Sequence, residues 1–443
     1  MPPGPHETEM IVAEPGGGDA QSNAAEPRRS IHLGILGRTP EFTPRQWRVF
    51  LIGATAGFFD NYDTALLSLA LRQIQASLRI AEARLGAILS LIRLGYILSF
   101  MLTPIADVFG RRRLLLYTIV GYTLFTALSA IAPGERSFVI FQIGARAFAG
   151  AEATIALVIL AEEVDAGVRG WAIGLLTALS LTGYGLAALA FGAIRIIPYG
   201  WRGLYSLALI PLAVIIPLRR TLPESRRFER ESATERAGLM RPLGELARVY
   251  PRRLGMMLAV QVLRNLGSAS AGAFFPKYLQ EVHRWTPAGV SKLFVLGGGI
   301  GILGSVIAGR LSDRYGRRTT GAIFMLMAPL LTLWIYSAAG ASVVPAWILE
   351  LFFDSASWAI VNSYSAELFP TSYRSTAASA ASIAGTTGGA LGLFMESVLY
   401  RWTGSPWSAI RILTLLWLGA PIVLFAFFPE TASAELETIS PAI

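Results

Sequence analysis

Two aspartates stand three residues apart inside an apolar stretch near the start of the chain. Asp60 and Asp63 lie in the segment 58–63, and their spacing places them on one face of a helix. Two close carboxylates in apolar surroundings repel each other when both are charged, so one of them readily takes a proton. This arrangement suits a group that loads and releases protons.

Arg146 and Glu152 interrupt a later apolar stretch. A charged Asp60 or Asp63 can pair with Arg146, and protonation of the aspartate would release the arginine, so the pair could work as a switch. Arg93 is the competing partner for the aspartates. The alternative interpretation is a static buried ion pair that only helps assembly.

Polar and aromatic residues also interrupt two apolar stretches in the second half of the chain. The candidates for solute binding are Gln261, Arg264, Asn265, Asp354, Trp358 and Asn362. The two amides are four residues apart, on one helical face, and suit hydrogen bonding to a polar solute. Arg264 and Lys277 could instead bind a carboxylate or phosphate, and Trp358 and Asn362 could serve packing between helices.

Charged motifs recur at one offset along the chain. The pattern Asp-x-x-Gly-Arg-Arg begins at Asp107 and again at Asp313, an offset of 313 − 107 = 206. Each copy places a carboxylate beside guanidinium groups at a helix end, which predicts a network that latches one side of the protein and opens when its halves move. The alternative is that these charges only fix the topology. The candidate gate residues are Asp107, Gly110, Arg111, Arg112, Glu162, Arg169, Asp313, Gly316, Arg317, Arg318, Glu367 and Arg374.

The elements that position these residues are predicted to be helices in lipid. Of the 443 residues, 53% are hydrophobic and 15% charged, which is too apolar for an ordinary soluble protein. The apolar residues gather into blocks of about twenty, the length that crosses a bilayer as a helix. We predict an all-α integral membrane protein with twelve spans, at about 47–75, 82–107, 113–132, 136–160, 168–195, 201–219, 253–281, 287–312, 319–338, 344–366, 374–400 and 407–428.

The distribution of basic residues predicts the orientation. Arginines cluster in the loops after even-numbered spans, which places those loops and both termini in the cytoplasm and the protein in the cell membrane. The predicted organisation is a disordered tail, a six-helix half, a central loop, a second six-helix half and a C-terminal tail, at 1–45, 46–220, 221–251, 252–428 and 429–443. Halves with six spans each are parallel repeats, with the solute site between them near mid-membrane.

At these motifs the chain resembles the major facilitator superfamily, whose signature is G-x-x-x-D-x-x-G-R-R/K. The second copy matches from Gly309, whereas the first has Thr103 in place of glycine. The acidic first span resembles that of proton-coupled metabolite symporters, and the segment Arg146-x-x-x-Gly150 resembles the family's fourth-helix motif. Pro429-Glu430-Thr431 resembles the sugar porter and metabolite:proton symporter branches. The resemblance implies the twelve-helix fold in two six-helix halves and a secondary transporter.

The leading hypothesis is proton-coupled symport of a small polar organic solute, an organic acid or a sugar-like metabolite, by alternating access. The alternatives are a proton-linked efflux antiporter, a uniporter and a transporter-like solute sensor. The expected partners are the lipid bilayer, the solute and protons, and the two-half architecture can work as a monomer.

Other classes of function find little support in the residues. The net charge of +9 comes from arginines between apolar blocks, not from a basic surface stripe, so nucleic acid is not an expected partner. The chain has no cysteine, and its three histidines form no metal-binding spacing. We expect no enzyme, no cofactor and no metal site.

Overall fold

The computed structural model describes residues 42–102, 111–164, 166–207, 209–210, 240–338, 340–370 and 372–432. The chain divides into two units, Met1–Arg45 and Gln46–Ile443, and the second unit carries the helices described below. Most of the predicted N-terminal tail and most of the predicted C-terminal tail lie outside the described residues, so their disorder stays a prediction.

The first half begins with a predicted span that forms two helices, because the chain turns at Ala70 between them. The last predicted span of this half is described only as a short helix and three further residues. The helices are α1 (Pro44–Leu69), α2 (Leu71–Leu78), α3 (Glu82–Leu102), α5 (Arg111–Ala130), α6 (Glu135–Glu163), α7 (Ala166–Gly192) and α8 (Trp201–Ser206).

The second half follows the same order, and its last predicted span is again divided, here at Leu418. The helices are α10 (Met240–Val249), α11 (Pro251–Glu281), α12 (Pro287–Tyr315), α13 (Arg317–Ile335), α14 (Val343–Glu367), α15 (Arg374–Thr403), α16 (Pro406–Trp417) and α17 (Gly419–Phe427), with a single 3-10 turn, η3 (Gly340–Ser342), before α14.

Helix α10 corrects the sequence analysis, which predicted only a polar loop over 221–251. Leu246 of this helix is fully buried and packs among apolar residues of α11 and α15, whereas Glu245 and Arg248 are exposed. The helix is amphipathic and only ten residues long, so its few apolar side chains do not stand out against the charges around them.

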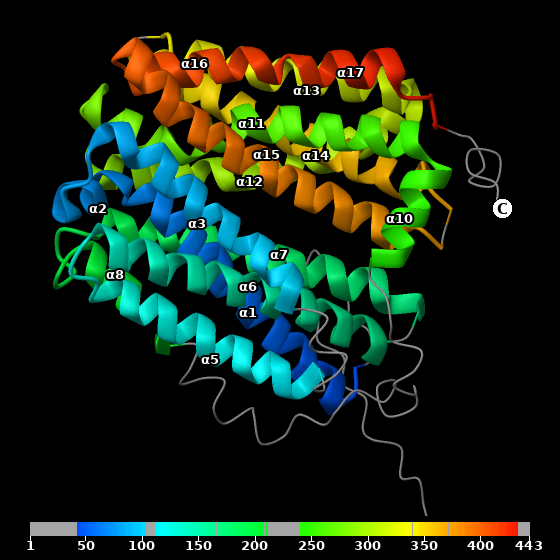
Figure 1. Cartoon of the computed structure of the whole chain (residues 1–443), viewed down its shortest axis with the longest axis horizontal. Helices are drawn as coiled ribbons and strands as arrows, with labels where there is room; N and C mark the ends of the chain where they lie inside the picture. The colour runs from blue at the N-terminus through cyan, green and yellow to red at the C-terminus, as the bar shows by residue number, and fades with distance from the viewer. Residues whose placement is uncertain are drawn as a thin grey trace, which may run out of the picture. The chain divides into compact units, whose positions relative to one another are not determined.

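Two pairs of long helices pack across the boundary between the halves. Helix α3 lies along α15, and α7 lies along α12. Within the halves, α6 packs against α3 and α5, and α14 packs against α12 and α13 (Figure 1). The candidate site therefore has walls from both halves.

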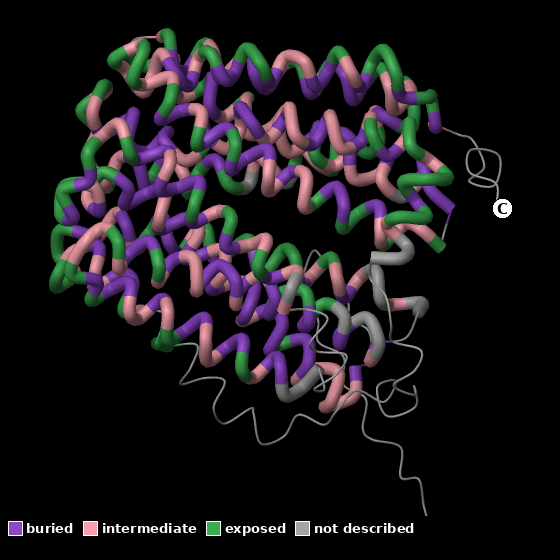
Figure 2. The backbone as a smooth tube through the Cα atoms, viewed as in Figure 1, coloured by how far each residue is buried: buried purple, intermediate pink, exposed green. Residues whose placement is uncertain are grey.

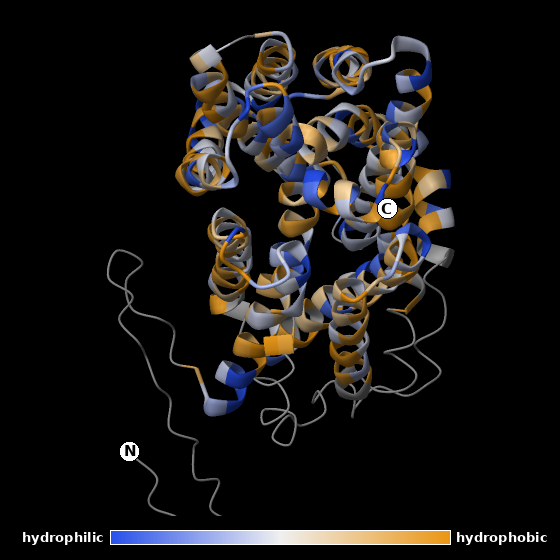
Figure 3. Ribbon diagram, turned by 90° about the vertical axis from the view of Figure 1, so that its left-hand side faces the viewer, coloured by the Kyte–Doolittle hydropathy of each residue, from blue (hydrophilic) through white to orange (hydrophobic). Residues whose placement is uncertain are grey.

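The outer faces of the helices are apolar. Leu189, Leu296 and Ile422 are 57%, 71% and 65% exposed, and exposed residues follow the outside of the bundle while buried ones face inward (Figure 2). Seven of the described helices are long and apolar enough to span a membrane. Helix α1 does not meet that criterion, because it carries the polar side chains of the predicted proton site. Seen from the end that carries α2, hydrophilic residues gather at helix ends and connections (Figure 3).

The two halves touch most closely at the end of the bundle that carries α2, here called the α2 end. Gln73 donates to Gln280 at 2.7 Å, and Ser90 donates to the carbonyl of Ala390 at 2.7 Å. The described hydrogen bonds and ion pairs between the halves all involve residues of α1, α2 or α3, from Ser68 to Arg93. The opposite end, which carries α10, is called the α10 end.

Candidate solute and proton site

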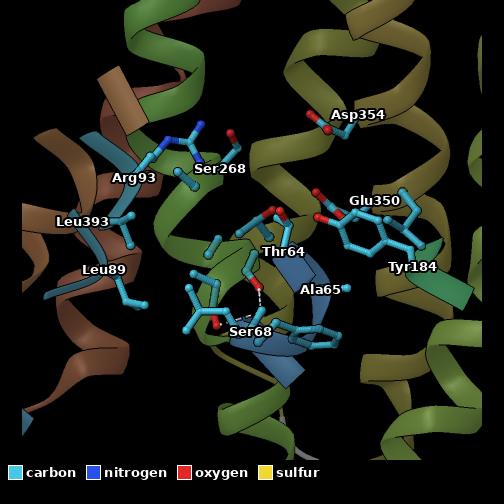
Figure 4. A pocket seen from close by; sticks show the side chains of 18 of the residues that line it. Thr64, Ala65, Ser68, Leu89, Arg93, Tyr184, Ser268, Glu350, Asp354 and Leu393 are labelled. Carbon is cyan, nitrogen blue, oxygen red and sulfur yellow. Dashed lines mark hydrogen bonds between the residues drawn. The ribbon is translucent and has the colours of Figure 1, made fainter. Parts of the chain in front are cut away.

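A cavity of about 440 Å³ lies between the halves, within the range of small-molecule sites. Three arginines and two acids reach it from four helices of the two halves: Arg93 of α3, Arg146 of α6, Arg264 of α11, and Glu350 and Asp354 of α14. Figure 4 shows Arg93, Glu350 and Asp354 around it together with Tyr184 and Ser268. The cavity therefore offers both signs of charge to a solute.

Arg146 lies beside both aspartates of α1. Its Nη2 is 3.0 Å from Asp63 Oδ2, and its Nη1 is 3.6 Å from Asp60 Oδ1. Arg146 and Asp63 are only 2% and 1% exposed, whereas the Asp60 side chain is 20% exposed. One guanidinium thus faces two carboxylates, so protonation of one aspartate would leave a balanced ion pair with the other.

Two hydroxyl groups connect this ion cluster to the cavity. Arg146 Nη1 donates to Thr64 Oγ1 at 2.6 Å, and the Tyr96 hydroxyl donates to Asp60 Oδ1 at 3.1 Å. Thr64 and Tyr96 both line the cavity. The sequence analysis missed them, because a hydroxyl in an apolar span does not stand out as a charge does.

Two predicted members of the proton site form no ion pair within it among the described residues, although Glu152 lies near enough to Asp60 for their charges to interact. Arg93 was the competing partner of the aspartates, but it instead faces the second half, where its guanidinium lies 3.4 Å from Asn265 Oδ1 and 3.4 Å from the carbonyl oxygen of Thr386. Glu152 is only 3% exposed and pairs with no base among the described residues. Glu152 follows Arg146 by six residues, which places it on a different face of α6.

The second half carries its own ion pair at the cavity. Arg264 Nη2 donates to Asp354 Oδ1 at 2.6 Å. Glu350 lies one helical turn before Asp354 on the same face of α14 and also lines the cavity. The sequence analysis missed Glu350, although an acid four residues before a chosen aspartate in the same apolar span was a usable signal.

The two ion pairs occupy corresponding helices with their charges exchanged. In the first half, the first span carries the acids and the fourth span carries Arg146. In the second half, the first span carries Arg264 and the fourth span carries Asp354. In both halves an ion pair therefore joins the first and fourth spans, but the acid and the base have changed places between the halves.

Four of the predicted solute-binding residues do not line the cavity. Gln261 is 9% exposed, and the Asn265 amide donates to the Gln261 carbonyl within α11 at 2.9 Å. Trp358 and Asn362 share a face of α14 with Asp354, but they lie about 6 and 12 Å farther along the helix axis. Trp358 is 51% exposed there. The role of these four side chains in solute binding stays a prediction.

The predicted gate network is described in the second half. Arg317 pairs with Asp313 at 3.2 Å and with Glu367 at 2.9 Å. Arg374 was expected to join them, but its Nε donates instead to the carbonyl oxygen of Phe369 at 3.3 Å. All these contacts lie within one half, so the described part of the motif does not latch the halves in this conformation.

The first-half copy of the network is not described in the same detail. Asp107 and Gly110 lie outside the described residues. Arg111, Arg112, Glu162 and Arg169 lie in described helices, but their side chains are not described. Their role in a gate stays a prediction.

Glu430 holds the end of α17 against the start of α13. Its carboxylate accepts hydrogen bonds from the backbone N–H groups of Arg317 and Arg318 at 2.7 and 3.1 Å. Gly316 has φ +94, and a Cβ atom there would lie 2.6 Å from Glu430 Oε2, so this motif position needs glycine. Burial alone would raise the pKa of Glu430, but the backbone hydrogen bonds outweigh it and lower the pKa below its usual 4.5. Arg318 also lies over the Phe425 ring at 4.8 Å.

A two-half helical bundle with charged groups around a cavity at its centre defines a membrane transporter. The family model described as Major Facilitator Superfamily matches residues 53–393 and 257–441. The chain belongs to the major facilitator superfamily and has its twelve-helix fold, which confirms the predicted resemblance and fold class. It is thus a multi-pass integral membrane transporter of a small molecule.

Similar proteins include several transporters. The chain is 24% identical over 415 residues to a probable 4-methylmuconolactone transporter of Cupriavidus pinatubonensis, covering 90% of this chain and 94% of that protein. It is also 24% identical over 425 residues to a 4-hydroxybenzoate transporter of Pseudomonas aeruginosa, covering 87% of this chain and 92% of that protein. The crystal structure of a D-xylose-proton symporter matches with a TM-score of 0.72 at 18% identity, covering 88% of this chain and 99% of that chain.

Proposed function

We propose that this transporter imports a small organic anion together with protons by alternating access. The observation that carries the proposal is Arg93. This arginine lines the cavity, and its described partners are a carbonyl and an amide oxygen, not an acid. A guanidinium at a cavity wall without a carboxylate partner suits the carboxylate of a solute, which it can bind through two hydrogen bonds.

The apolar wall of the cavity favours a planar solute body. The Phe275 and Trp347 rings stack at 5.4 Å with 19° between their planes, and Phe294 lies beside them. All three line the cavity. Rings of this kind pack well against a flat conjugated molecule. The named substrates of two relatives, 4-hydroxybenzoate and niacin, combine a ring with a carboxylate and support this substrate class.

The coupling to protons is proposed to run through the cluster around Arg146. When Asp63 is charged, the buried cluster holds two negative charges and one positive charge. A proton on Asp63 leaves one charge of each sign. The Tyr96 and Thr64 hydroxyls provide contact between this cluster and the cavity. A solute that binds these hydroxyls would alter their contacts with Arg146 and Asp60. It would therefore change how readily the aspartates hold a proton.

The α10 end is proposed to be cytoplasmic. The arginine-rich loop motifs lie at that end, and basic residues favour the cytoplasmic side. The conformation described, with the halves joined at the α2 end, would then be closed to the outside. One of the similar solved structures is an inward-open xylose transporter from E. coli, with a TM-score of 0.70, which agrees with this assignment.

The test is transport by the purified protein in liposomes, followed with a pH-sensitive dye inside. The solutes are 4-hydroxybenzoate, nicotinate, cis,cis-muconate, D-xylose and a phosphate ester. We expect internal acidification with one or more carboxylates and loss of it in Asp63→Asn. In Arg93→Gln the half-saturating concentration should rise about tenfold to a hundredfold, because a charge-assisted bond is lost.

Arg195→Gln is the matched control, since Arg195 is exposed outside the cavity and its loss should leave uptake unchanged. Uptake of xylose alone, with equal affinity in Arg93→Gln and the parent, would contradict the organic-anion assignment. Uptake of a carboxylate with no pH change in the parent would contradict proton coupling and leave a uniporter.

A further inference from the structure

A second group of charges ties the halves together at the α2 end. Lys277 of α11 is 0% exposed, and its ammonium group donates to Glu82 at the start of α3. Glu281 lies 3.4 Å from the same ammonium group, and Arg72 of α2 lies 4.0 Å from the other oxygen of Glu281. One buried base therefore bridges an acid of the first half and an acid of its own helix.

Glu396 of α15 is a buried carboxylate beside this group. It is 0% exposed, and neither of its oxygens makes a hydrogen bond of ordinary geometry to a described residue, although the backbone N–H of Gly86 faces the carboxylate. The carboxylate lies against Gly86, one turn along α3 from Glu82, so that a Cβ atom on Gly86 would be 2.3 Å from Glu396 Oε2. Glu82 and Lys277 are the charged groups that face it.

The other bases on the helices around this carboxylate are directed elsewhere. Arg84 of α3 pairs with Glu135 at 2.5 Å. Arg411 of α16 donates to Ser408 at 3.0 Å. Arg401, on α15 itself, is exposed. The buried carboxylate thus has no base of its own in the part of the chain that the structure describes.

The charges count against an ionised Glu396 in this conformation. Lys277 already faces Glu82 and Glu281, so a third carboxylate would add negative charge where, besides Lys277, only the backbone N–H of Gly86 faces it. A buried acid in that position is stable only as the neutral form. If the α2 end opened, α3 would move away with Glu82 and water would enter, which would leave Glu281 and Glu396 as the acids beside Lys277.

We propose that Glu396 is a second proton-binding site, which holds a proton while the α2 end is closed and returns it to the solution at that end when the halves part. The proton is taken from that solution and goes back to it, so it is not carried across the membrane with the solute. Acid on that side favours closure and alkali favours opening. Only the naming of that side as external rests on the proposed function.

The absence of cysteine from the chain allows a direct test by labelling one introduced cysteine. Ala269 lines the cavity, so Ala269→Cys reacts with a membrane-impermeant maleimide from the α2 end only when that end opens. Ile196 is 83% exposed in the connection before α8, and Ile196→Cys gives the reference rate. Both are measured in membrane vesicles of one sidedness, with the internal pH fixed and the external pH varied.

With Glu396 intact, we expect the ratio of the two rates to rise about fivefold between about pH 5.5 and about pH 8.5. In Glu396→Gln it should stay at the low value across that range. Labelling of Ile196→Cys shows directly whether the α2 end faces out, and vesicles of the opposite sidedness are used if it does not. A flat ratio with Glu396 intact, or an unchanged rise in Glu396→Gln, overturns the proposal.

Two further variants separate this site from the proposed transport cycle. Asp63→Asn should lose solute-driven acidification and keep the pH-dependent labelling, whereas Glu396→Gln should keep the acidification. Glu82→Gln removes the competing acid, so Glu396 can pair with Lys277 and the rise in labelling should move to lower pH. If Glu396→Gln does not fold, Glu82→Gln alone tests the proposal. The proposal is overturned if the labelling ratio of Glu82→Gln rises at the same pH as that of the parent.

Discussion

Arg264 and Asp354 form an ion pair at the cavity that a bound anion would have to share. The pair is short, at 2.6 Å, and the Asp354 side chain is 28% exposed whereas that of Arg264 is 8% exposed. A solute carboxylate that reaches Arg264 would compete with Asp354, because the two acids need the same guanidinium. Asp354 therefore lies where it would compete with a bound anion for Arg264.

Replacement of Asp354 by asparagine is expected to strengthen binding of an organic anion about tenfold, since the competing charge is removed while the shape is kept. The fluorescence of Trp347, which lines the cavity, reports binding in detergent. Arg264→Gln should have the opposite effect. Weaker binding in Asp354→Asn would show that this aspartate supports the solute instead of competing with it.

At this scale, sequence alone recovered the charges and misjudged their surroundings. Asp60, Asp63, Arg146 and Arg264 were found because each charge inside an apolar span has to be explained. Glu396 obeys the same rule and was overlooked. The face and depth of Gln261 could not be read from the sequence, since the register of a helix against its neighbours depends on packing across the whole bundle.

Among the elements, α13 depends on a carboxylate from the far end of the chain. Glu430 accepts the first two N–H groups of α13, which have no partner within the helix. The carboxylate also meets the positive end of the helix dipole. This contact joins the chain after α17 to the start of α13 at the α10 end.

Loss of the charge in Glu430→Gln is expected to cost about 1 kcal/mol, in the range of a helix cap and reduced by exposure to solvent. Because the pKa of Glu430 is lowered on folding, its contribution is present above the usual value of 4.5 and is lost as the pH falls below it. Thermal unfolding in detergent should show a lower Tm for the variant at pH 7 and a smaller difference below about pH 4. An equal difference at both pH values would contradict this account.

The contact of α7 with α1 depends on glycines of both helices, among them Gly183. A Cβ atom on Gly183 would lie 1.9 Å from the carbonyl oxygen of Phe58, whereas one on Gly185 would meet nothing within 4 Å. Gly183→Ala should therefore push α1 and its aspartates away from α7 and destabilise the protein by about 1 to 3 kcal/mol. Gly185→Ala is the matched control and should be neutral or slightly stabilising. Equal Tm values for the two variants would show that α1 moves without cost.

For the molecule as a whole, the number of spans and the division into halves followed from the sequence, because lipid leaves a hydrophobic chain little choice but helices. The conformation did not. Which end of a transporter is closed depends on small differences between packed states of the same helices, and these differences leave no periodic pattern. The sequence did not predict that the halves are joined at the α2 end, and only the structure shows it.

The joined α2 end predicts that a cross-link there stops transport. Gln73 and Gln280 touch across the halves, so Gln73→Cys with Gln280→Cys, joined by a short bifunctional maleimide, should reduce uptake to the background of empty liposomes. Each single variant treated with the same reagent should retain uptake. Full transport by the cross-linked protein would mean that this end does not open during the cycle.

The exchanged ion pairs give the cavity an electrical direction that its repeated backbone lacks. Arg93 marks the α3 wall, whereas Glu350 and Asp354 mark the α14 wall. The carboxylate of a solute would be drawn to Arg93, whose described partners carry no charge, more than to Arg264, which already pairs with Asp354 at 2.6 Å. Solutes would then enter the cavity in one preferred orientation. Two solutes that carry the same groups in reversed order would then fit the cavity equally well by shape but bind with different affinities.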